Sequence, residues 1–234
     1  MTEYQDHYQI TTQINPGILS HKLNKDHMDL LWSYIKDSTK RGGWVLDENN
    51  KVIERDDFQE WTLEDTTNRF GSEVLSPAIN KYIEYWGYPT ACLGTHFPIP
   101  KFSRFWVRLS GRGEYQALHE HQSIWTFIVW MNIPFEPEDE HSEKENDAHP
   151  EGANVTIIYT DAVGRIRKQP YVLGKKDEGT ILVFPSSLNH IVYPHHTTDE
   201  YRISIAGDIC VDSLNCHDPV MMDKQNDYLY PKTL

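Results

Sequence analysis

The spacing of apolar residues in the first half of the chain predicts two helices. In the segment 24–43 the apolar residues recur three and four positions apart, as on one face of a helix. Asn24 is expected to cap the start of this helix, and the glycines at 42 and 43 are expected to end it. A short strand is expected ahead of it, before the turn at Pro16–Gly17.

The second helix is predicted to begin at Ser76, because a capping residue followed by Pro77 is typical of a helix start. Apolar residues at helical spacing continue to Trp86, and Gly87 is expected to end the helix. One or two helical turns are also expected within residues 62–72.

From about residue 100 the pattern changes to short segments rich in Val, Ile, Tyr, Phe and Trp, separated by turn residues, from "RFWVRLS" to "YRISIAGDI". This spacing predicts an all-β sandwich or barrel. Because the helices precede the strands, the predicted fold class is α+β, with the helices packed on one side of the β-core. The acidic segment 136–147 is interpreted as a solvated loop between strands.

Composition and charge narrow the choice of partners and compartment. The net charge is −13 and the 22 Lys and Arg residues are dispersed, so neither duplex DNA nor an anionic membrane is an expected partner. No stretch is long and apolar enough to span a bilayer, and the polar N-terminus lacks the features of a signal peptide. The cysteines Cys92, Cys210 and Cys216 have no metal-binding spacing, which predicts reduced thiols in a cytoplasmic protein.

The candidate chemistry begins with His119 and His121, in the predicted strand "YQALHEH". Residues two apart on a strand point to the same face, so these imidazoles are expected to lie side by side and to offer two ligands of a metal site. Two polar residues on a wet strand face are the alternative. Most other histidines are interpreted as surface or structural residues, and His195 and His196 are expected to be exposed in a polar turn.

A third ligand must come from another strand, and His190 in "FPSSLNHIVY" is the candidate. Farther along, Arg202 and Ser204 share one face of the strand "YRISIAG", whose other face is apolar. A buried guanidinium needs an anionic partner, because an unpaired buried charge costs several kcal/mol. That partner is either a ligand carboxylate or an internal salt bridge, for example with Asp208.

The pattern "HEH … FPSSLNHIVYP … YRISIAG" resembles the Fe(II)- and 2-oxoglutarate-dependent oxygenases, and is most similar to those found in phages and marine bacteria. The resemblance covers roughly residues 100–210 and implies a double-stranded β-helix, a jelly-roll or cupin-like core. It implies one oxygenase domain over 1–234. In that domain, residues 1–99 supply the N-terminal strand and helices, 100–210 the β-core and 211–234 a C-terminal extension.

Carried over to this sequence, the resemblance makes His119 and His190 iron ligands. It makes Arg202 and Ser204 the residues that bind the distal carboxylate of 2-oxoglutarate. The sequence departs from the family pattern at His121, where a carboxylate is usual. We expect His121 to be the third ligand; Glu120 is the alternative, although it should face away from His119 on a regular strand.

The resemblance implies an Fe(II)-dependent dioxygenase with 2-oxoglutarate as co-substrate. Such a hydroxylase uses O2 to oxidise a C–H bond and releases succinate and CO2. The sequence does not identify the substrate. Because members of the family often modify proteins, the resemblance favours a protein or peptide side chain as the substrate. Two rival functions stay open. One is a three-histidine cupin-type dioxygenase that uses no 2-oxoglutarate, and the other is a non-catalytic β-sandwich module of a phage or carbohydrate-binding kind.

Overall fold

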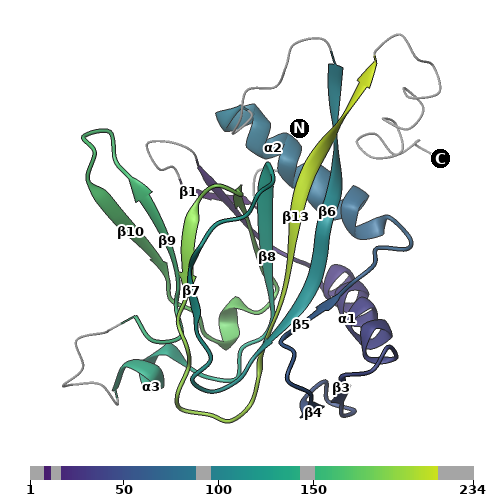
Figure 1. Ribbon diagram of the computed structural model, residues 1–234, viewed down its shortest axis with the longest axis vertical. Helices are drawn as coiled ribbons and strands as arrows, with labels where there is room; N and C mark the ends of the chain where they lie inside the picture. Colours follow the sequence, from purple (N-terminus) through teal and green to yellow (C-terminus); the bar gives the residue numbers. More distant parts are fainter. Residues whose placement is uncertain (1–7, 12–16, 88–95, 143–150, 216–234) are drawn as a thin grey trace.

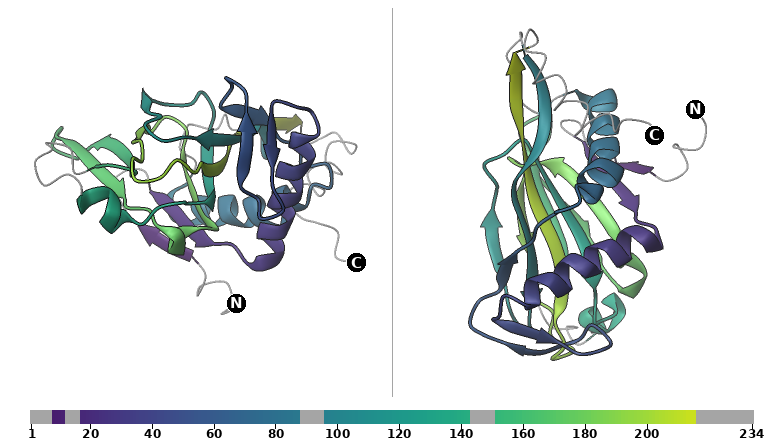
Figure 2. Two further views of the ribbon diagram at one scale, coloured as in Figure 1. Left: turned by 90° about the horizontal axis from the view of Figure 1, so that it is seen from below. Right: turned by 90° about the vertical axis from the view of Figure 1, so that its right-hand side faces the viewer.

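The computed structural model describes residues 8–11, 17–87, 96–142 and 151–215. Two antiparallel sheets face each other, and helices α1 (Lys25–Thr39) and α2 (Ser76–Trp86) lie on one side of the larger sheet (Figures 1 and 2). This arrangement confirms the α+β class and the helices packed on one side of a β-core.

Eight strands form the core, and the chain passes back and forth between the two sheets. The larger sheet holds β6, β8, β11 and β13, in the order β11-β8-β13-β6, and the smaller sheet has the order β10-β9-β12-β7. This alternation makes a double-stranded β-helix, which confirms the predicted fold. The strands are β6 (His96–Ser110), β7 (Gln116–His119), β8 (Trp125–Asn132), β9 (Val155–Thr160), β10 (Ile166–Tyr171), β11 (Thr180–Pro185), β12 (Asn189–Val192) and β13 (Arg202–Asn215).

Segments from the N-terminal part extend the larger sheet at both edges. Strands β1 (Tyr8–Thr11) and β2 (Ile18–Lys22) continue it beside β11, and β5 (Glu60–Thr62) pairs with β6 at the other edge. Strands β3 (Trp44–Leu46) and β4 (Val52–Arg55) form a separate hairpin. Pro16, in the predicted turn, lies outside the described residues.

The predicted start of α1 is confirmed, because the Asn24 side chain accepts a hydrogen bond from the backbone N–H of His27 at 2.8 Å. The predicted cap at Ser76 is wrong. A π-helical turn, Gly71–Leu75, runs directly into α2, and the Ser76 hydroxyl donates to the Gly71 carbonyl at 2.9 Å. Of the range 62–72, in which one or two helical turns were expected, only residues 69–72 are helical, and Glu60–Thr62 forms β5.

Side chains of the larger sheet divide between two apolar clusters. Its outer face packs against the helices, where Ile79 and Ile35 meet Ile203 and Ile205 of β13. Its inner face, with Trp130 and other apolar residues, packs against the smaller sheet. The alternation expected for "YRISIAG" is confirmed, because Arg202 and Ser204 point to the inner side, where they line a cavity.

The described part of the acidic segment 136–147 is not the solvated loop that we predicted, and residues 143–147 lie outside the described residues. Residues Pro137–Ser142 form the short helix α3, and Glu140 is fully buried. Its carboxylate accepts hydrogen bonds from the backbone N–H groups of His196 and Thr197, at 2.8 and 2.9 Å. These bonds satisfy amides of a partly buried turn, which explains why a carboxylate enters the interior here.

His195 is fully buried in that turn, so its predicted exposure is also wrong. Its ring stacks on Phe135 with centroids 5.1 Å apart, and its Nε2 lies 3.0 Å from the Glu200 carbonyl oxygen. The remaining helical segment is a 3₁₀ turn, Lys175–Asp177.

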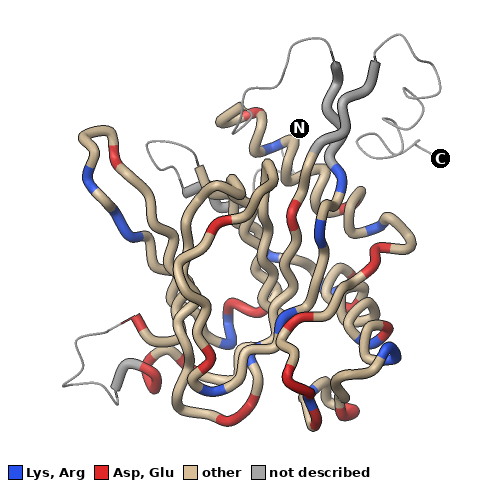
Figure 3. Tube along the Cα trace, viewed as in Figure 1, with Lys and Arg blue, Asp and Glu red and all other residues tan. Residues whose placement is uncertain are grey.

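Charged residues are spread over many elements of the described chain (Figure 3). None of the helices in the described residues has both the length and the apolar character needed to cross a bilayer.

Candidate metal centre

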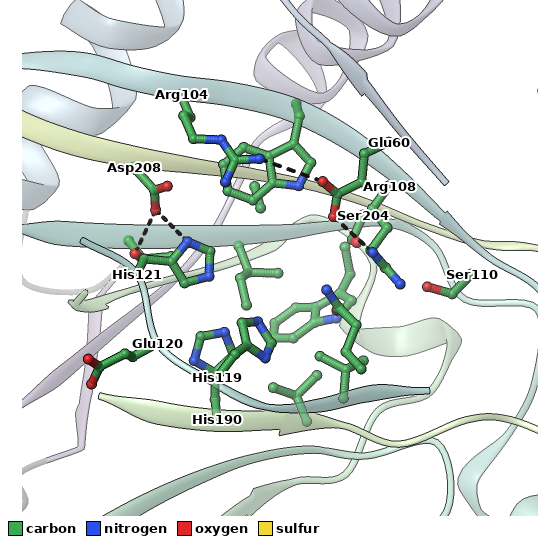
Figure 4. Close-up of a pocket in the computed structure, with 18 of the residues that line it drawn as sticks. Glu60, Arg104, Arg108, Ser110, His119, Glu120, His121, His190, Ser204 and Asp208 are labelled. Carbon is green, nitrogen blue, oxygen red and sulfur yellow. Dashed lines mark hydrogen bonds and ion pairs between the residues drawn. The ribbon is translucent and has the colours of Figure 1, made fainter. Parts of the chain in front are cut away.

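Three histidines from neighbouring strands meet inside the double-stranded β-helix. His119 ends β7 and lies directly opposite His190 of β12, and His121 follows two residues after His119. The backbone N–H of His121 donates to the Ser186 carbonyl at 2.8 Å, which fixes the chain beyond the end of β7. One ring nitrogen of each histidine lies within 4.8 Å of the ring nitrogens of the other two (Figure 4).

The hydrogen bonds of the three rings determine which nitrogen is free for a metal. Each Nδ1 lies within hydrogen-bonding distance of an oxygen that can only accept, so each Nδ1 carries the proton and each Nε2 has a free lone pair. This is the state in which imidazole binds a transition metal, with an outer partner that orients the ring. The three oxygens belong to Ala117 (2.7 Å from His119), Leu188 (3.0 Å from His190) and the Asp208 side chain (2.8 Å from His121).

Burial keeps the rings of His119 and His190 neutral. It lowers the pKa of His190 to about 3, assisted by the proximity of His119, and burial likewise lowers the pKa of His119. Neutral imidazoles need no proton removed before they bind a metal. Glu120, the alternative ligand, does not belong to the cluster, and its carboxylate points away from the three rings in Figure 4.

The cluster faces a cavity of about 540 Å³ between the sheets, within the range of small-molecule sites. Arg202, Ser204 and Asp208 line the same cavity from β13. The structure therefore brings all five residues predicted from the sequence, the three histidines with Arg202 and Ser204, into one space.

Arg202 is almost fully buried, and its guanidinium extends to the rim of the smaller sheet. Nη1 donates to the Ala153 carbonyl at 2.9 Å and Nη2 to the Tyr193 carbonyl at 3.4 Å. Burial, and then the positive charge of Arg108, lowers the pKa of Arg202 to about 10, so the group stays charged at neutral pH.

The predicted alternative of a salt bridge between Arg202 and Asp208 is wrong, because the Asp208 carboxylate binds His121 instead. Among the described residues, no carboxylate lies within 4.0 Å of the Arg202 guanidinium. The charge of Arg202 is therefore met at close range by two backbone carbonyls, and the charge of Glu140 attracts it from farther away.

The cavity wall formed by β6 contains three polar residues that the sequence reasoning did not select. Arg104, Arg108 and Ser110 lie on the cavity side of β6, on the same face as Trp106. Arg108 donates to Glu60 at 2.8 Å and to the Gln59 side chain at 2.6 Å. Their signal was the alternation of polar and apolar residues in "SRFWVRLSG", in which Arg108 and Ser110 repeat the Arg-x-Ser pattern of Arg202 and Ser204.

Trp106 connects this wall to the histidines. Its ring stacks on His121 with centroids 5.7 Å apart and planes 13° apart, and the Arg104 guanidinium lies 4.4 Å above the indole. The His121 ring is also stacked with His190, at 5.2 Å and also 13°. His121 thus packs against two flat rings, which limits rotation of the imidazole.

Residues 104–208 match the model of a family described as "Putative 2OG-Fe(II) oxygenase". Three of the similar solved structures are a Pseudomonas putida prolyl-4-hydroxylase, the alpha-ketoglutarate-dependent carbocyclase SnoK from nogalamycin biosynthesis, and a prolyl 4-hydroxylase from Phytophthora capsici. The first is 15% identical, with a TM-score of 0.47 and coverage of 84% of this chain and 93% of that one. The second is 8% identical, with a TM-score of 0.48 and coverage of 89% of this chain and 86% of that one. The third is 13% identical, with a TM-score of 0.45 and coverage of 91% of this chain and 67% of that one.

No curated protein matches the chain in sequence. The family match spans the double-stranded β-helix and includes the three histidines, Arg202, Ser204 and Asp208. It confirms the resemblance to the 2-oxoglutarate- and Fe(II)-dependent oxygenases.

Proposed function

We propose that this chain, whose β-core matches the 2OG-Fe(II) oxygenase family, is an Fe(II)- and 2-oxoglutarate-dependent hydroxylase of a C–H bond that releases succinate and CO2. The observation that carries the proposal is the convergence of three histidine rings, each with its Nδ1 engaged elsewhere, in a cavity that also contains a buried arginine. A cavity that brings three imidazoles and a buried cation together suits a metal and a dicarboxylate.

In this proposal His119, His121 and His190 hold the metal through Nε2. Arg202 and Ser204 bind the distal carboxylate of 2-oxoglutarate. The bound iron and keto acid supply the activation of O2 for C–H oxidation. The protein supplies ring orientation, the buried cation and the cavity between the two sheets.

The position of Arg202 supports a carboxylate partner. A guanidinium has five N–H donors, and its planar fork matches a carboxylate. Two carbonyl contacts, one of them long, leave donors for a ligand. Ser204 and Ser110, on neighbouring positions of β13 and β6, place hydroxyl groups beside it on the same wall.

We further propose a protein or peptide side chain as the substrate, as the family resemblance implies, and a single oxygenase domain over residues 1–234. Membership among the phage and marine bacterial relatives and a cytoplasmic location also remain predictions.

The test is to titrate the metal-free protein with Fe(II) under anaerobic conditions, with and without 2-oxoglutarate. We expect one equivalent of iron to bind and a weak visible absorption band of an Fe(II)–keto acid chelate to appear only with 2-oxoglutarate. The second candidate is a three-histidine dioxygenase that uses no 2-oxoglutarate, and the observation in its favour is that the third ligand is the imidazole of His121. Iron binding with no absorption band and no affinity for 2-oxoglutarate would support this candidate instead. A chain that binds no metal would favour the non-catalytic module.

A further inference from the structure

We infer that Asp208 is the carboxylate of this metal site, and that it acts through His121 as a positioning residue and not as a ligand. The inference rests on the proposed function, since it concerns the same metal. It answers the question raised by the sequence, which has histidine at the position where a carboxylate is usual.

The first argument is the difference between the three outer partners. His119 and His190 direct Nδ1 to backbone carbonyls, whereas His121 directs Nδ1 to the Asp208 carboxylate, at 2.8 Å. A hydrogen bond to a charged acceptor is roughly twice as strong as one between neutral groups. His121 is therefore the histidine whose Nδ1–H is fixed most firmly, and the most electron-rich of the three at Nε2.

The second argument is the burial of Asp208, which is only 4% exposed. Placing a carboxylate in the interior is costly unless its oxygens are hydrogen-bonded. Here Oδ1 also lies 2.9 Å from the Thr126 hydroxyl, which in turn lies 2.9 Å from the Ser186 hydroxyl. Since the Ser186 carbonyl accepts from the backbone N–H of His121, the network holds both the main chain and the ring of His121.

The third argument is charge. Three neutral imidazoles bring no negative charge to a divalent metal, whereas two imidazoles and a carboxylate bring one. Asp208 places that negative charge one imidazole away from the metal. This arrangement is the carboxylate–histidine–metal relay found behind many metal-binding histidines.

Direct ligation by Asp208 does not fit the geometry. Its carboxylate lies on the Nδ1 side of His121, and the group of mutually close ligand atoms contains the three histidines alone among the described residues. To make room for Asp208 as a ligand, the His121 ring would have to give up its stacking on Trp106 and His190. Figure 4 shows Asp208 on the far side of His121 from His119 and His190.

The experiment compares Asp208→Asn and Asp208→Ala with the wild type in titrations with Mn(II) and Co(II). We expect Asp208→Ala to weaken metal binding about 10- to 100-fold, the usual effect of losing an outer partner of a metal-binding histidine. Asp208→Asn keeps an oxygen acceptor for the His121 Nδ1–H, so its metal affinity should fall less than that of Asp208→Ala. Glu120→Gln is the matched control, since it removes a charge next to His121 without this hydrogen bond, and its affinity should stay within about twofold of the wild type.

Two measurements separate this role from a structural one. Melting of the metal-free variants shows whether the fold persists, and Thr126→Val, which keeps the shape of the side chain, should weaken metal binding in the same direction but less. In the zinc-loaded protein, a downfield exchangeable His121 Nδ1 proton should be present and should disappear in Asp208→Ala.

Asp208→Ala with wild-type metal affinity would overturn the inference alone. Loss of metal binding in Glu120→Gln would overturn it in favour of Glu120 as a ligand. If the wild type itself binds neither metal, the proposed function fails first, and the inference fails with it.

Discussion

Arg202 at the start of β13 lies directly opposite Ser110 at the end of β6. Two residues farther along, Ser204 lies opposite Arg108, so two Arg-x-Ser segments run antiparallel and alternate across the strand pair. Directly opposed side chains on neighbouring strands have their Cβ atoms about 5 Å apart. Since Ser110 is 3% exposed and lines the cavity, its hydroxyl is within reach of any carboxylate that Arg202 binds.

Ser110→Ala should therefore weaken 2-oxoglutarate binding and leave metal binding unchanged. A hydrogen bond to a charged group contributes about 1.5–3 kcal/mol, which corresponds to roughly 10- to 150-fold in affinity. Calorimetric titration of the metal-loaded protein measures the effect. Ser33→Ala, which removes a hydroxyl on α1 that bonds to its own helix, is the control. Equal affinity in Ser110→Ala and the wild type would show that the hydroxyl does not meet the carboxylate.

His190→Ala should abolish metal binding while the fold persists. The imidazole is lost from the centre of the cluster, where its ring centroid lies 4.1 Å from that of His119, and two histidines remain. Metal analysis and near-UV circular dichroism test the two parts of the prediction. His196→Ala changes a histidine of the nearby turn outside the cluster and should bind metal as the wild type does. Normal turnover of 2-oxoglutarate by His190→Ala would show that the metal centre is assigned wrongly.

The metal-free protein should lose stability in mild acid because of His190. Its pKa falls from 6.5 to about 3 on folding, so between these values the unfolded chain binds a proton that the native state does not. Above pH 6.5 His190 is neutral in both states and costs no stability. Below pH 6.5 the free energy of unfolding falls by up to about 1.4 kcal/mol per pH unit. The lowered pKa of His119 acts in the same direction.

Urea unfolding with a chelator at pH 7.5 and 5.5 measures this dependence. His190→Gln lacks the titrating group, so its free energy of unfolding should fall between the two pH values by about 1 kcal/mol less than that of the wild type. Parallel behaviour of both proteins would mean that His190 is protonated in the native state.

The sequence could predict the ligands because their signals are local and periodic. The spacing of His119 and His121 places both on one face, and the alternation around Arg202 places the guanidinium inside. It could not predict Asp208 as the partner of His121, because that contact depends on how β13 lies beside β8 and beyond the end of β7. Nor could it predict that Glu140 is buried, since an acidic run is normally solvated and its hydrogen-bond partners come from a turn more than fifty residues away.

Helix starts show the same limit. Asn24 caps α1 through a contact three residues away, which the local sequence specifies. Ser76 has the same local signal, but the π-helical turn before it already supplies a helical partner for its hydroxyl. The role of Ser76 therefore depends on the conformation of the segment before it. The local pattern Ser76–Pro77 contains no information about that conformation.

Arg202→Lys should weaken 2-oxoglutarate binding roughly 10- to 150-fold, the effect of losing one hydrogen bond to a charged group of about 1.5–3 kcal/mol. Lysine keeps the positive charge but cannot form the two-pronged contact that the guanidinium fork offers to a carboxylate. Metal affinity should be largely spared, because Arg202 is not a ligand and the three histidines keep their own outer partners.

The competing explanation is that Arg202 is a structural residue. It ties Ala153 to Tyr193 through their carbonyls, so its replacement could loosen the rim of the smaller sheet. A thermal melt of the metal-free variant, run beside a 2-oxoglutarate titration of the iron-loaded variant, separates the two roles. A lower melting temperature with an unchanged dissociation constant would reject the co-substrate role and favour a dioxygenase that uses no 2-oxoglutarate. A raised dissociation constant with a melting temperature within a few degrees of the wild type would assign Arg202 to the carboxylate.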